Sequence, residues 1–457
     1  MNKYLQSGIE HYQNHDFDNA KLVFVKALEE NPYDYKALCF LGAVLSMEKE
    51  YDSARTLLEN SIAINPHYAQ SHNNLGMLFY EKGEYGKAVN SFLEALGCDK
   101  NDAMVYNNLA TAYKVLGKYN EATRAFTKAI EKNPSFGVAL YNLGNLYFDT
   151  LKEYEKGYAY YQKAYEAGAR HKELLLKLIR IAFYFDDEKN LEKYFATVST
   201  GNEDLETTIY RSIHAWLRRG EYMRVPSPPY DIQNEQILKF MLGYGMFLPL
   251  LGDFKRDNPQ MYSECKSEKK LTLIGDSHVL SYAGLCLDEM TKIDSRVIVG
   301  AKAWHLAAKE RNIYNHSLKK MMQKVPKGSK VVLFFGEIDC RDDEGFLKQK
   351  AKDDTYALEE SIEEVVRKYV DFAKKTARKR KLELYFANVP PPSENYASKK
   401  SATVVATFNE ILQRYAKEKI IDRYTPYKQE NGFATKGSHI DNVHLCPFTE
   451  IFTKIKG

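Results

Sequence analysis

The sequence predicts a two-part protein, an all-α solenoid followed by an α/β domain with a parallel sheet. Three observations carry this prediction. Residues recur with a 34-residue period through the N-terminal half, strand-like and helical patterns alternate in the C-terminal half, and glycines follow three of those strands. A chain of 457 residues has room for two or three domains. We expect a solenoid of about five repeats plus capping helices over residues 1–200, a helical connector over 201–265 and the α/β domain over 266–457.

Small and apolar residues mark the repeat. The recurring positions are Gly8, Gly42, Gly76, Ala110 and Gly144; Ala20, Ala54, Ala88 and Ala122; Leu41, Leu75, Leu109 and Leu143; and Pro32, Pro66 and Pro134. Small side chains such as Gly76 and Ala88 let two helices approach closely, while Phe92 and Phe126 fill the gap between them. One extra residue near 152–154 lengthens the fifth unit. The pattern resembles the tetratricopeptide repeat, whose helix-turn-helix units stack into a superhelix.

Asparagines recur at the same spacing, at Asn74, Asn108 and Asn142. The resemblance places this position on the concave groove of the solenoid. The ladder is similar to that in the repeats of O-linked N-acetylglucosamine transferase, where it grips the backbone of an extended peptide. An amide both donates to and accepts from a main chain, so it binds peptide without reading its sequence. We therefore expect a protein or peptide partner in the groove; the alternative is that these asparagines are merely polar, exposed residues.

Two short motifs stand out in the C-terminal half. An apolar run at 271–275 ends in Asp276, Ser277 and His278, and Asp441 and His444 follow far downstream. A serine at the point where a strand gives way to a helix lies beside free N–H groups and a positive dipole end, which favour an oxyanion. Asp-x-x-His supplies a general base and the carboxylate that orients it. Together the motifs predict an activated serine nucleophile.

The order serine, aspartate, histidine, with two residues between the last two, resembles the SGNH/GDSL hydrolase family. These enzymes are esterases, lipases and carbohydrate O-deacetylases on a flavodoxin-like α/β/α sandwich. The resemblance covers residues 266–457 and implies a role for each matching residue. Ser277 is the nucleophile and one oxyanion donor through its N–H, His444 the general base and Asp441 its orienting partner. Gly300, after the second strand, supplies a second oxyanion N–H.

One block departs from the family pattern. The family usually shows Gly-x-Asn-Asp after the third strand, and this chain has Gly336-Glu337-Ile338-Asp339. Ile338 therefore stands where the family has an asparagine that donates the third oxyanion hydrogen bond, and isoleucine donates none. Loss of one such donor typically lowers turnover by ~10²–10³. Arg341 or another nearby donor is the expected substitute.

Four further residues are expected to line the site: Asp276, His278, Glu337 and Asp339. The alternative for Glu337 and Asp339 is an ion-pair cluster with Arg341 at a strand end.

The downstream motif also has a metal-binding alternative. His439, Asp441 and His444 are residue types that bind zinc. Ser277 would then have no role, so we expect no metal and no cofactor.

The alternation of apolar and amphipathic segments predicts a parallel sheet with helical crossovers. Strands are expected at 271–275, 296–300, 330–335, 382–387 and 420–424, and helices at about 355–380 and 402–419. Ligands of such sheets bind outside the carboxyl ends of the strands. Gly275, Gly300 and Gly336 all follow strands, so their loops should converge on one crevice.

Composition narrows the class of protein. The 65 basic and 61 acidic residues give a net charge of +4, which offers no general affinity for nucleic acid. No stretch approaches 18 apolar residues, so no membrane span is expected. The N-terminus lacks an apolar signal segment, and the six cysteines show no CxxC spacing. These features favour a cytoplasmic location.

The function predicted from the sequence is a serine-dependent esterase acting on O-acyl groups of a carbohydrate or glycoprotein, with the solenoid recruiting a protein partner. Two alternatives remain open at this point. The same triad supports acyl transfer to a sugar hydroxyl, and a non-catalytic protein would only bind glycan and scaffold its partners.

Overall fold

The computed structural model describes residues 3–198, 205–221, 235–262, 265, 269–288, 291–395, 397–436, 438–439, 444, 452 and 455; side chains at 235–243, 245 and 246 are not described. The chain divides into two compact units, Met1–Leu174 and Leu175–Gly457. The division falls earlier than residue 200, the expected end of the solenoid. Helices that follow residue 174 pack onto the second unit, as shown below.

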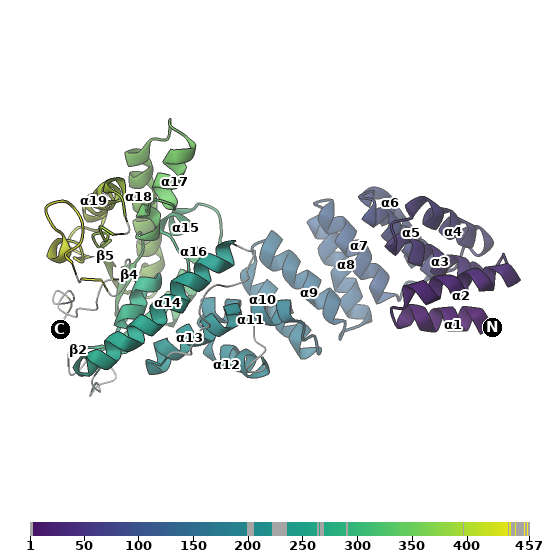
Figure 1. Cartoon of the computed structure of the whole chain (residues 1–457), viewed down its shortest axis with the longest axis horizontal. Coiled ribbons are helices and arrows are strands. Elements are labelled where there is room, and N and C mark those ends of the chain that lie inside the picture. The colour runs from purple at the N-terminus through teal and green to yellow at the C-terminus, as the bar shows by residue number, and fades with distance from the viewer. Residues whose placement is uncertain are drawn as a thin grey trace. The chain divides into compact units, whose positions relative to one another are not determined.

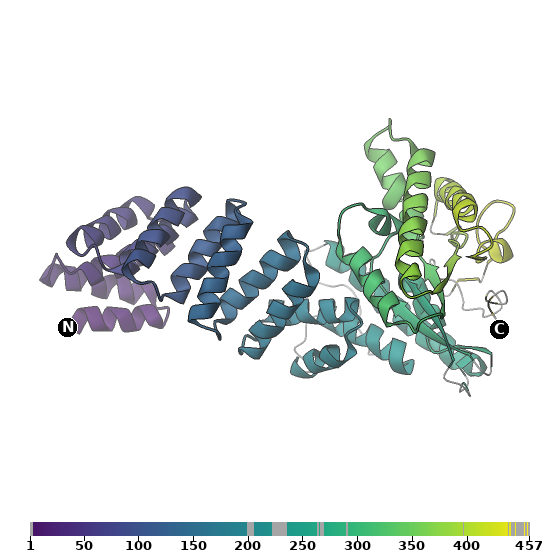
Figure 2. The same cartoon turned by 180° about the vertical axis from the view of Figure 1, so that it is seen from behind.

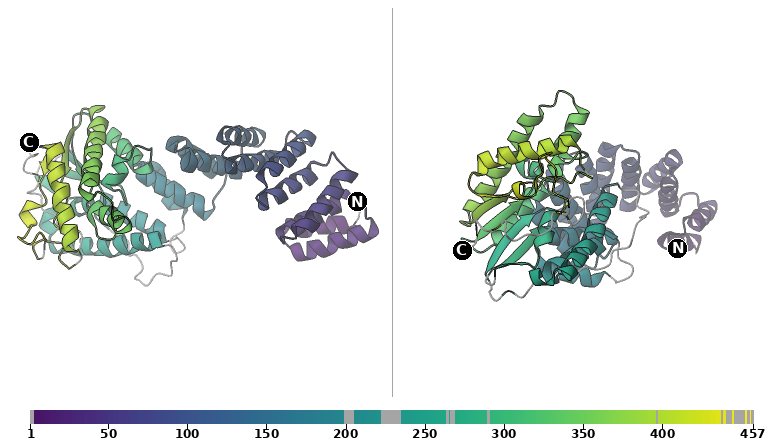
Figure 3. Two further views of the ribbon diagram at one scale, coloured as in Figure 1. Left: turned by 90° about the horizontal axis from the view of Figure 1, so that it is seen from above. Right: turned by 60° about the vertical axis from the view of Figure 1, so that its left-hand side comes forward.

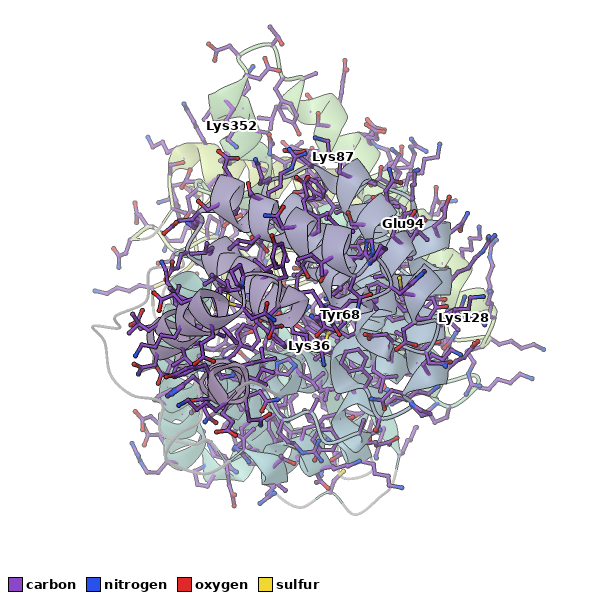
Figure 4. All side chains as sticks on the ribbon, turned by 90° about the vertical axis from the view of Figure 1, so that its right-hand side faces the viewer. Lys36, Tyr68, Lys87, Glu94, Lys128 and Lys352 are labelled. Carbon is purple, nitrogen blue, oxygen red and sulfur yellow. The ribbon has the colours of Figure 1, made fainter. Side chains whose placement is uncertain are left out.

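The first unit is a stack of antiparallel helix pairs (Figures 1 and 2). Its helices are α1 (Lys3–Gln13), α2 (Phe17–Glu30), α3 (Tyr35–Met47), α4 (Tyr51–Ile64), α5 (Ala69–Glu81), α6 (Tyr85–Cys98), α7 (Ala103–Val115), α8 (Tyr119–Lys132), α9 (Gly137–Asn145) and α10 (Tyr154–Glu166). Charged side chains such as Lys87 and Glu94 on α6 and Lys128 on α8 point outward from the helices (Figure 4). Most of the buried side chains are apolar, as a stack of amphipathic helices requires.

Four of the five helix pairs close by packing a large side chain onto a glycine, and α7 has Ala110 at the equivalent position. The pairs are Gly8 with Phe24, Gly42 with Leu58, Gly76 with Phe92, and Gly144 with Tyr161. A Cβ atom at Gly76 would lie 2.6 Å from the Phe92 ring, so only glycine fits there. The recurring glycines of the sequence are therefore required by close helix contact.

The extra residue of the fifth unit is absorbed in a widened turn. Helix α9 continues into a π-helical segment, Leu146–Thr150, and Lys152 adopts a left-handed backbone with φ of 55°. A π-turn accommodates one additional residue within a helix. The insertion thus leaves the pairing of α9 with α10 intact.

Substitution of Gly76 tests this packing. Gly76→Ala should lower the free energy of unfolding by ~1–3 kcal/mol, because the added methyl group forces the Phe92 ring to move. Gly86→Ala is the matched control, since a Cβ at Gly86 on α6 meets no atom within 4 Å. The control should be neutral or stabilising by up to ~1 kcal/mol. Equal urea midpoints for the two variants would contradict the packing account.

The second unit contains one mixed, six-stranded sheet with the order β2-β3-β1-β4-β5-β6. The strands are β1 (Lys270–Gly275), β2 (Cys286–Asp288), β3 (Thr291–Val297), β4 (Lys330–Phe334), β5 (Glu383–Ala387) and β6 (Ile420–Ile421). All neighbouring pairs are parallel except β2 with β3. The expectation of a purely parallel sheet is therefore wrong at this edge, where a short hairpin adds an antiparallel strand.

The second predicted strand lies too far along the chain. It was expected at 296–300, whereas β3 covers Thr291–Val297. The burial of β3 alternates along its length, as in a strand with one covered face, and only its last residues continue into an apolar run. Strand β6 is also shorter than the expected 420–424.

Helices flank the strands of this sheet (Figure 3, right). The helices of this part of the chain are α11 (Lys172–Tyr184), α12 (Glu188–Thr197), α13 (Leu205–Arg219), α14 (Glu235–Asp257), α15 (Ala303–Ala307), α16 (Ile313–Lys324), α17 (Gly345–Lys352), α18 (Leu358–Arg378) and α19 (Lys399–Ala416). Helix α18 packs against α15, α16, α19 and β5. In the described part of the chain, no helix has the length and apolar character of a membrane span.

Helix α11, expected in the solenoid, and helix α13, expected in the connector, both make hydrogen bonds to loops beside the sheet. Trp216 on α13 is fully buried and donates from Nε1 to the Leu280 carbonyl oxygen at 2.9 Å. The Tyr184 hydroxyl on α11 donates to the carbonyl oxygen of Val299 at 3.3 Å. These bonds join α11 and α13 to the loops that follow β1 and β3.

Candidate active site

Three loops meet at the carboxyl edge of the sheet. Gly275 at the end of β1 pairs in register with Val297 of β3 on one side and with Phe334 of β4 on the other. The N–H of Ile298 donates to the Gly275 carbonyl oxygen at 2.7 Å, and the N–H of Asp276 donates to Phe334 at 3.1 Å. The carboxyl ends of β1, β3 and β4 therefore lie side by side, and the loops that contain Gly300 and Gly336 start from the last two of them.

Ser277 and His444 are brought together across 167 residues of chain. The Ser277 Oγ and His444 Nε2 atoms are 2.8 Å apart, and His444 is buried. This is the hydrogen bond that a general base makes with the hydroxyl it activates. Asp441, the predicted orienting carboxylate, lies outside the described residues.

The segment after Ser277 differs from the expected helix. It is a 3-10 segment, Ser277–Tyr282, and the Asp276 side chain caps it by accepting from the N–H of His278. A segment of six residues has too few aligned peptide groups for a substantial dipole. The electrostatic contribution predicted from a helix terminus is therefore small, and the local N–H groups remain as the donors.

Asp276 and His278, both predicted to line the site, form a buried pair. The Asp276 carboxylate and the His278 Nδ1 atom are 2.9 Å apart, and the His278 ring lies 4.9 Å from the His444 ring. Burial by itself raises the pKa of the Asp276 carboxyl. The charge of His278 and two hydrogen bonds from that residue outweigh burial, so the pKa lies below its usual value. Asp276 is thus an anion that holds His278 beside His444.

Gly300 lies in the turn that follows β3. Its φ of 69° is in the left-handed region, which glycine adopts at little cost. The turn is held by Asp339, whose carboxylate accepts from the N–H groups of Ala303 at 2.7 Å and Trp304 at 3.1 Å. Asp339 is fully buried, so it is a positioning residue for this loop rather than part of a surface ion-pair cluster.

Glu337 and Arg341 form an ion pair at the end of β4. The Arg341 guanidinium donates from Nε and Nη2 to both Glu337 oxygens, over distances of 2.6 to 2.9 Å. An ion pair with Arg341 at a strand end was the alternative to a site-lining role for Glu337. It also occupies Arg341, the residue expected to replace the missing oxyanion donor. Ile338 is half-buried between them.

A cavity of about 260 Å³ opens beside this ion pair. Its wall includes Glu337, Arg341, Asp342 and Asp343 on one side and Pro390–Pro392 on the other. Carboxylates and a guanidinium offer many hydrogen bonds, while the three prolines give a stiff apolar surface.

Two aromatic residues at the site were not anticipated from the sequence. Phe247 on α14 stacks on His444, with ring centroids 3.6 Å apart and an angle of 14° between the planes. Tyr244, one helical turn earlier, shares a hydrogen bond with Ser277. The signal available in the sequence was the spacing of these two residues, which puts them on one face of a helix.

In the first unit, the predicted asparagine ladder makes contacts between repeats. Asn108 Nδ2 donates to Asn73 Oδ1 at 3.1 Å, and Asn142 Nδ2 donates to Asn107 Oδ1 at 3.0 Å. Asn74 Nδ2 contacts the Cys39 sulfur at 3.2 Å and is buried. The ladder therefore links successive repeats; its predicted contact with a peptide stays a prediction.

The metal alternative finds no support within the described residues. Among them, no group of three or more histidine, cysteine, aspartate or glutamate side chains is placed to hold an ion. Asp441, one of the three proposed ligands, is outside that set.

Comparisons with known proteins identify the repeats. Three models described as tetratricopeptide repeat match residues 33–101, 103–136 and 138–167. These residues are tetratricopeptide repeats, a fold whose stacked units form extended concave binding surfaces. No similar sequence was found among curated proteins.

Several solved structures are similar to part of the chain. One is pilF of Pseudomonas aeruginosa, with 25% identity over 46% of this chain and 95% of that one, and a TM-score of 0.40. Another is PilW, described as a widely conserved type IV pilus biogenesis factor, with 19% identity, coverage of 45% and 96%, and a TM-score of 0.39. A third is MamA, with 23% identity, coverage of 35% and 93%, and a TM-score of 0.31.

The buried carboxyl of Asp339 predicts a pH dependence of stability. Burial raises its pKa to about 7, against the opposing effects of the two backbone N–H donors and Lys302. A carboxyl whose pKa is raised on folding keeps its proton in the folded state while the unfolded chain loses it. Stability therefore falls as pH rises from about 4 to about 7, by at most ~4 kcal/mol.

Asp339→Asn removes this titration and keeps an acceptor oxygen for the loop. The free energy of unfolding of the variant relative to the wild type should therefore rise between pH 4 and pH 7. Urea unfolding at several pH values measures the difference. A difference that stays constant over this window would mean that Asp339 is ionised in the folded protein.

Proposed function

We propose that residues 266–457 form a serine esterase of the SGNH/GDSL type that removes O-acyl groups from a carbohydrate or glycoprotein. The observation that carries the proposal is the 2.8 Å contact between Ser277 Oγ and His444 Nε2. A buried imidazole in hydrogen-bond contact with a serine hydroxyl is the arrangement that activates serine as a nucleophile. The order of strands β3-β1-β4-β5-β6 supports a flavodoxin-like sheet, with the site at the carboxyl ends of its strands.

The proposed reaction has two halves. Ser277 Oγ attacks the acyl carbonyl carbon while His444 Nε2 takes the hydroxyl proton, which gives a tetrahedral oxyanion. The oxyanion collapses, the sugar oxygen leaves with the proton from His444, and the acyl group stays on Ser277. Water then attacks the acyl-serine with His444 as base, releases the carboxylic acid and restores the serine. Asp441 is expected to orient the imidazole.

Groups around the site are proposed to orient the catalytic base and to stabilise the charges that form during the reaction. Phe247 stacks on the His444 ring and so fixes its plane. When His444 carries the proton, the face of the Phe247 ring also favours the resulting cation, by ~0.5–1 kcal/mol or more. The N–H groups of Ser277 and Gly300 are the proposed donors to the oxyanion.

The cavity beside Glu337 and Arg341 supports a carbohydrate as the substrate. Sugar hydroxyls both donate and accept, and the wall supplies the carboxylates of Asp342 and Asp343 as well as the ion pair. Hydrogen-bonding groups around a small cavity give orientation and specificity.

The tetratricopeptide repeats are proposed to bring a protein partner to the enzyme. Concave surfaces of such repeats bind extended peptides. Asn108 and Asn142 each use one N–H in a bond between repeats. An amide has two N–H donors and two acceptor lone pairs, so capacity for a peptide backbone remains. The partner would carry the acylated glycan.

Hydrolysis of p-nitrophenyl acetate tests the serine mechanism. The wild type should release p-nitrophenol faster than Ser277→Ala and His444→Ala, each of which should lose at least ~10³-fold in kcat/KM. Ser281→Ala is a matched control, because Ser281 is a buried serine of the same 3-10 segment whose hydroxyl has no hydrogen-bond partner among the described residues. It should retain wild-type activity.

Equal rates for wild type, Ser277→Ala and His444→Ala would contradict the proposal. Release of p-nitrophenol that accelerates when a sugar acceptor is added, with acetyl-sugar as the product, would instead assign acyl transfer to the same residues.

A further inference from the structure

Helix α14 brings an aromatic face to the proposed nucleophile and base. Tyr244 and Phe247 are both buried and lie one turn apart, so they point to the same side of the helix. Leu248 and Leu251, each fully buried, anchor the helix to the second unit. The position of the Tyr244 hydroxyl is thus fixed by packing rather than by a mobile side chain.

The surroundings of Tyr244 keep its hydroxyl protonated. Burial raises the pKa of the phenol well above its usual value, and the negative charge of Asp276 adds to the effect. Arg341 and the hydrogen bond to Ser277 oppose the rise without reversing it. A neutral phenol next to the nucleophile is a hydrogen-bond donor at every pH at which an esterase works.

We propose that the Tyr244 hydroxyl is a third oxyanion donor, in addition to the N–H groups of Ser277 and Gly300. In the resting protein this hydroxyl shares a hydrogen bond with Ser277. When Ser277 Oγ bonds to the acyl carbon, the new oxyanion is one atom removed from Oγ and within reach of the same O–H. The Tyr244 hydroxyl then donates its hydrogen bond to the oxyanion instead of sharing one with Ser277, and it keeps its proton throughout.

The two other side chains considered for the third oxyanion hydrogen bond, those of Ile338 and Arg341, do not supply it. Ile338, in the loop after β4, carries no polar side-chain atom, and the Arg341 guanidinium is engaged by Glu337. Tyr244 reaches the site from α14, an element outside the sheet and its crossover helices. The inference rests on the proposed esterase function and assigns to it one further catalytic residue.

Tyr244→Phe tests the inference, because it removes the hydroxyl and keeps the packed ring. With p-nitrophenyl acetate, kcat should fall by ~10²–10³ while KM changes little, since the donor acts on charge that exists only in the transition state. Tyr262→Phe is the matched control: in the described part of the chain its buried hydroxyl has no hydrogen-bond partner, and its ring packs against Trp216. The control should keep wild-type kcat, and both variants should melt within a few degrees of the wild type.

A second readout separates an oxyanion donor from a structural tyrosine. Sulfur accepts hydrogen bonds weakly, so an oxyanion site favours an ester over the matching thionoester. The ratio of kcat/KM for p-nitrophenyl acetate to that for its thionoacetate should be high in the wild type and in Tyr262→Phe. It should fall in Tyr244→Phe.

The outcomes distinguish this inference from the function on which it rests. Wild-type kcat or an unchanged ester-to-thionoester ratio in Tyr244→Phe would overturn the donor role and leave the esterase intact. A faster Tyr244→Phe variant would also overturn it and show that the hydroxyl restrains the serine. A wild type no faster than Ser277→Ala would overturn the esterase proposal and the inference with it.

Discussion

The second unit is organised around the contact between the Ser277 hydroxyl and the His444 imidazole. It joins two residues that lie 167 positions apart in the chain. Three neighbouring strands make the contact possible, because β1, β3 and β4 end together and their loops emerge at one edge. Two buried carboxylates fix the segments around this contact. Asp276 makes a hydrogen bond with His278, and Asp339 accepts hydrogen bonds from the backbone just after Gly300. Loss of the sheet register at Gly275 would separate all of these groups at once.

Helix α14 closes the other side of this centre. Its buried Phe247 and Tyr244 contact the imidazole and the serine, so a segment that precedes the sheet in the chain completes the site. The first unit follows a different rule, in which the same small-residue contact is repeated from one helix pair to the next. The second unit is thus built around one site whose residues are far apart in the sequence. The first unit is built from contacts between neighbouring helices that repeat along the chain.

This difference explains what the sequence could and could not predict. The repeats were readable because Gly76 and its equivalents recur at fixed spacing, and the family models confirm them. The strands that start at 270, 330 and 383 were placed within a residue of their observed starts, since both faces are buried and the runs are apolar. Strand β3 was misplaced because its pattern alternates, and β2 was missed because three residues carry almost no signal. Tyr244 and Phe247 could not be assigned to the site, because helical periodicity gives the face of α14 but not the surface that it meets.

Covalent labelling by a fluorophosphonate tests the central contact most directly, because the probe reacts with a serine only where a base activates it. The wild-type chain is incubated with the probe, digested, and its modified peptides are mapped by mass spectrometry. The account predicts a single adduct on Ser277, absent from Ser277→Ala and formed far more slowly in His444→Ala. No adduct on Ser277 in the folded protein, or one whose rate of formation does not depend on His444, would contradict it.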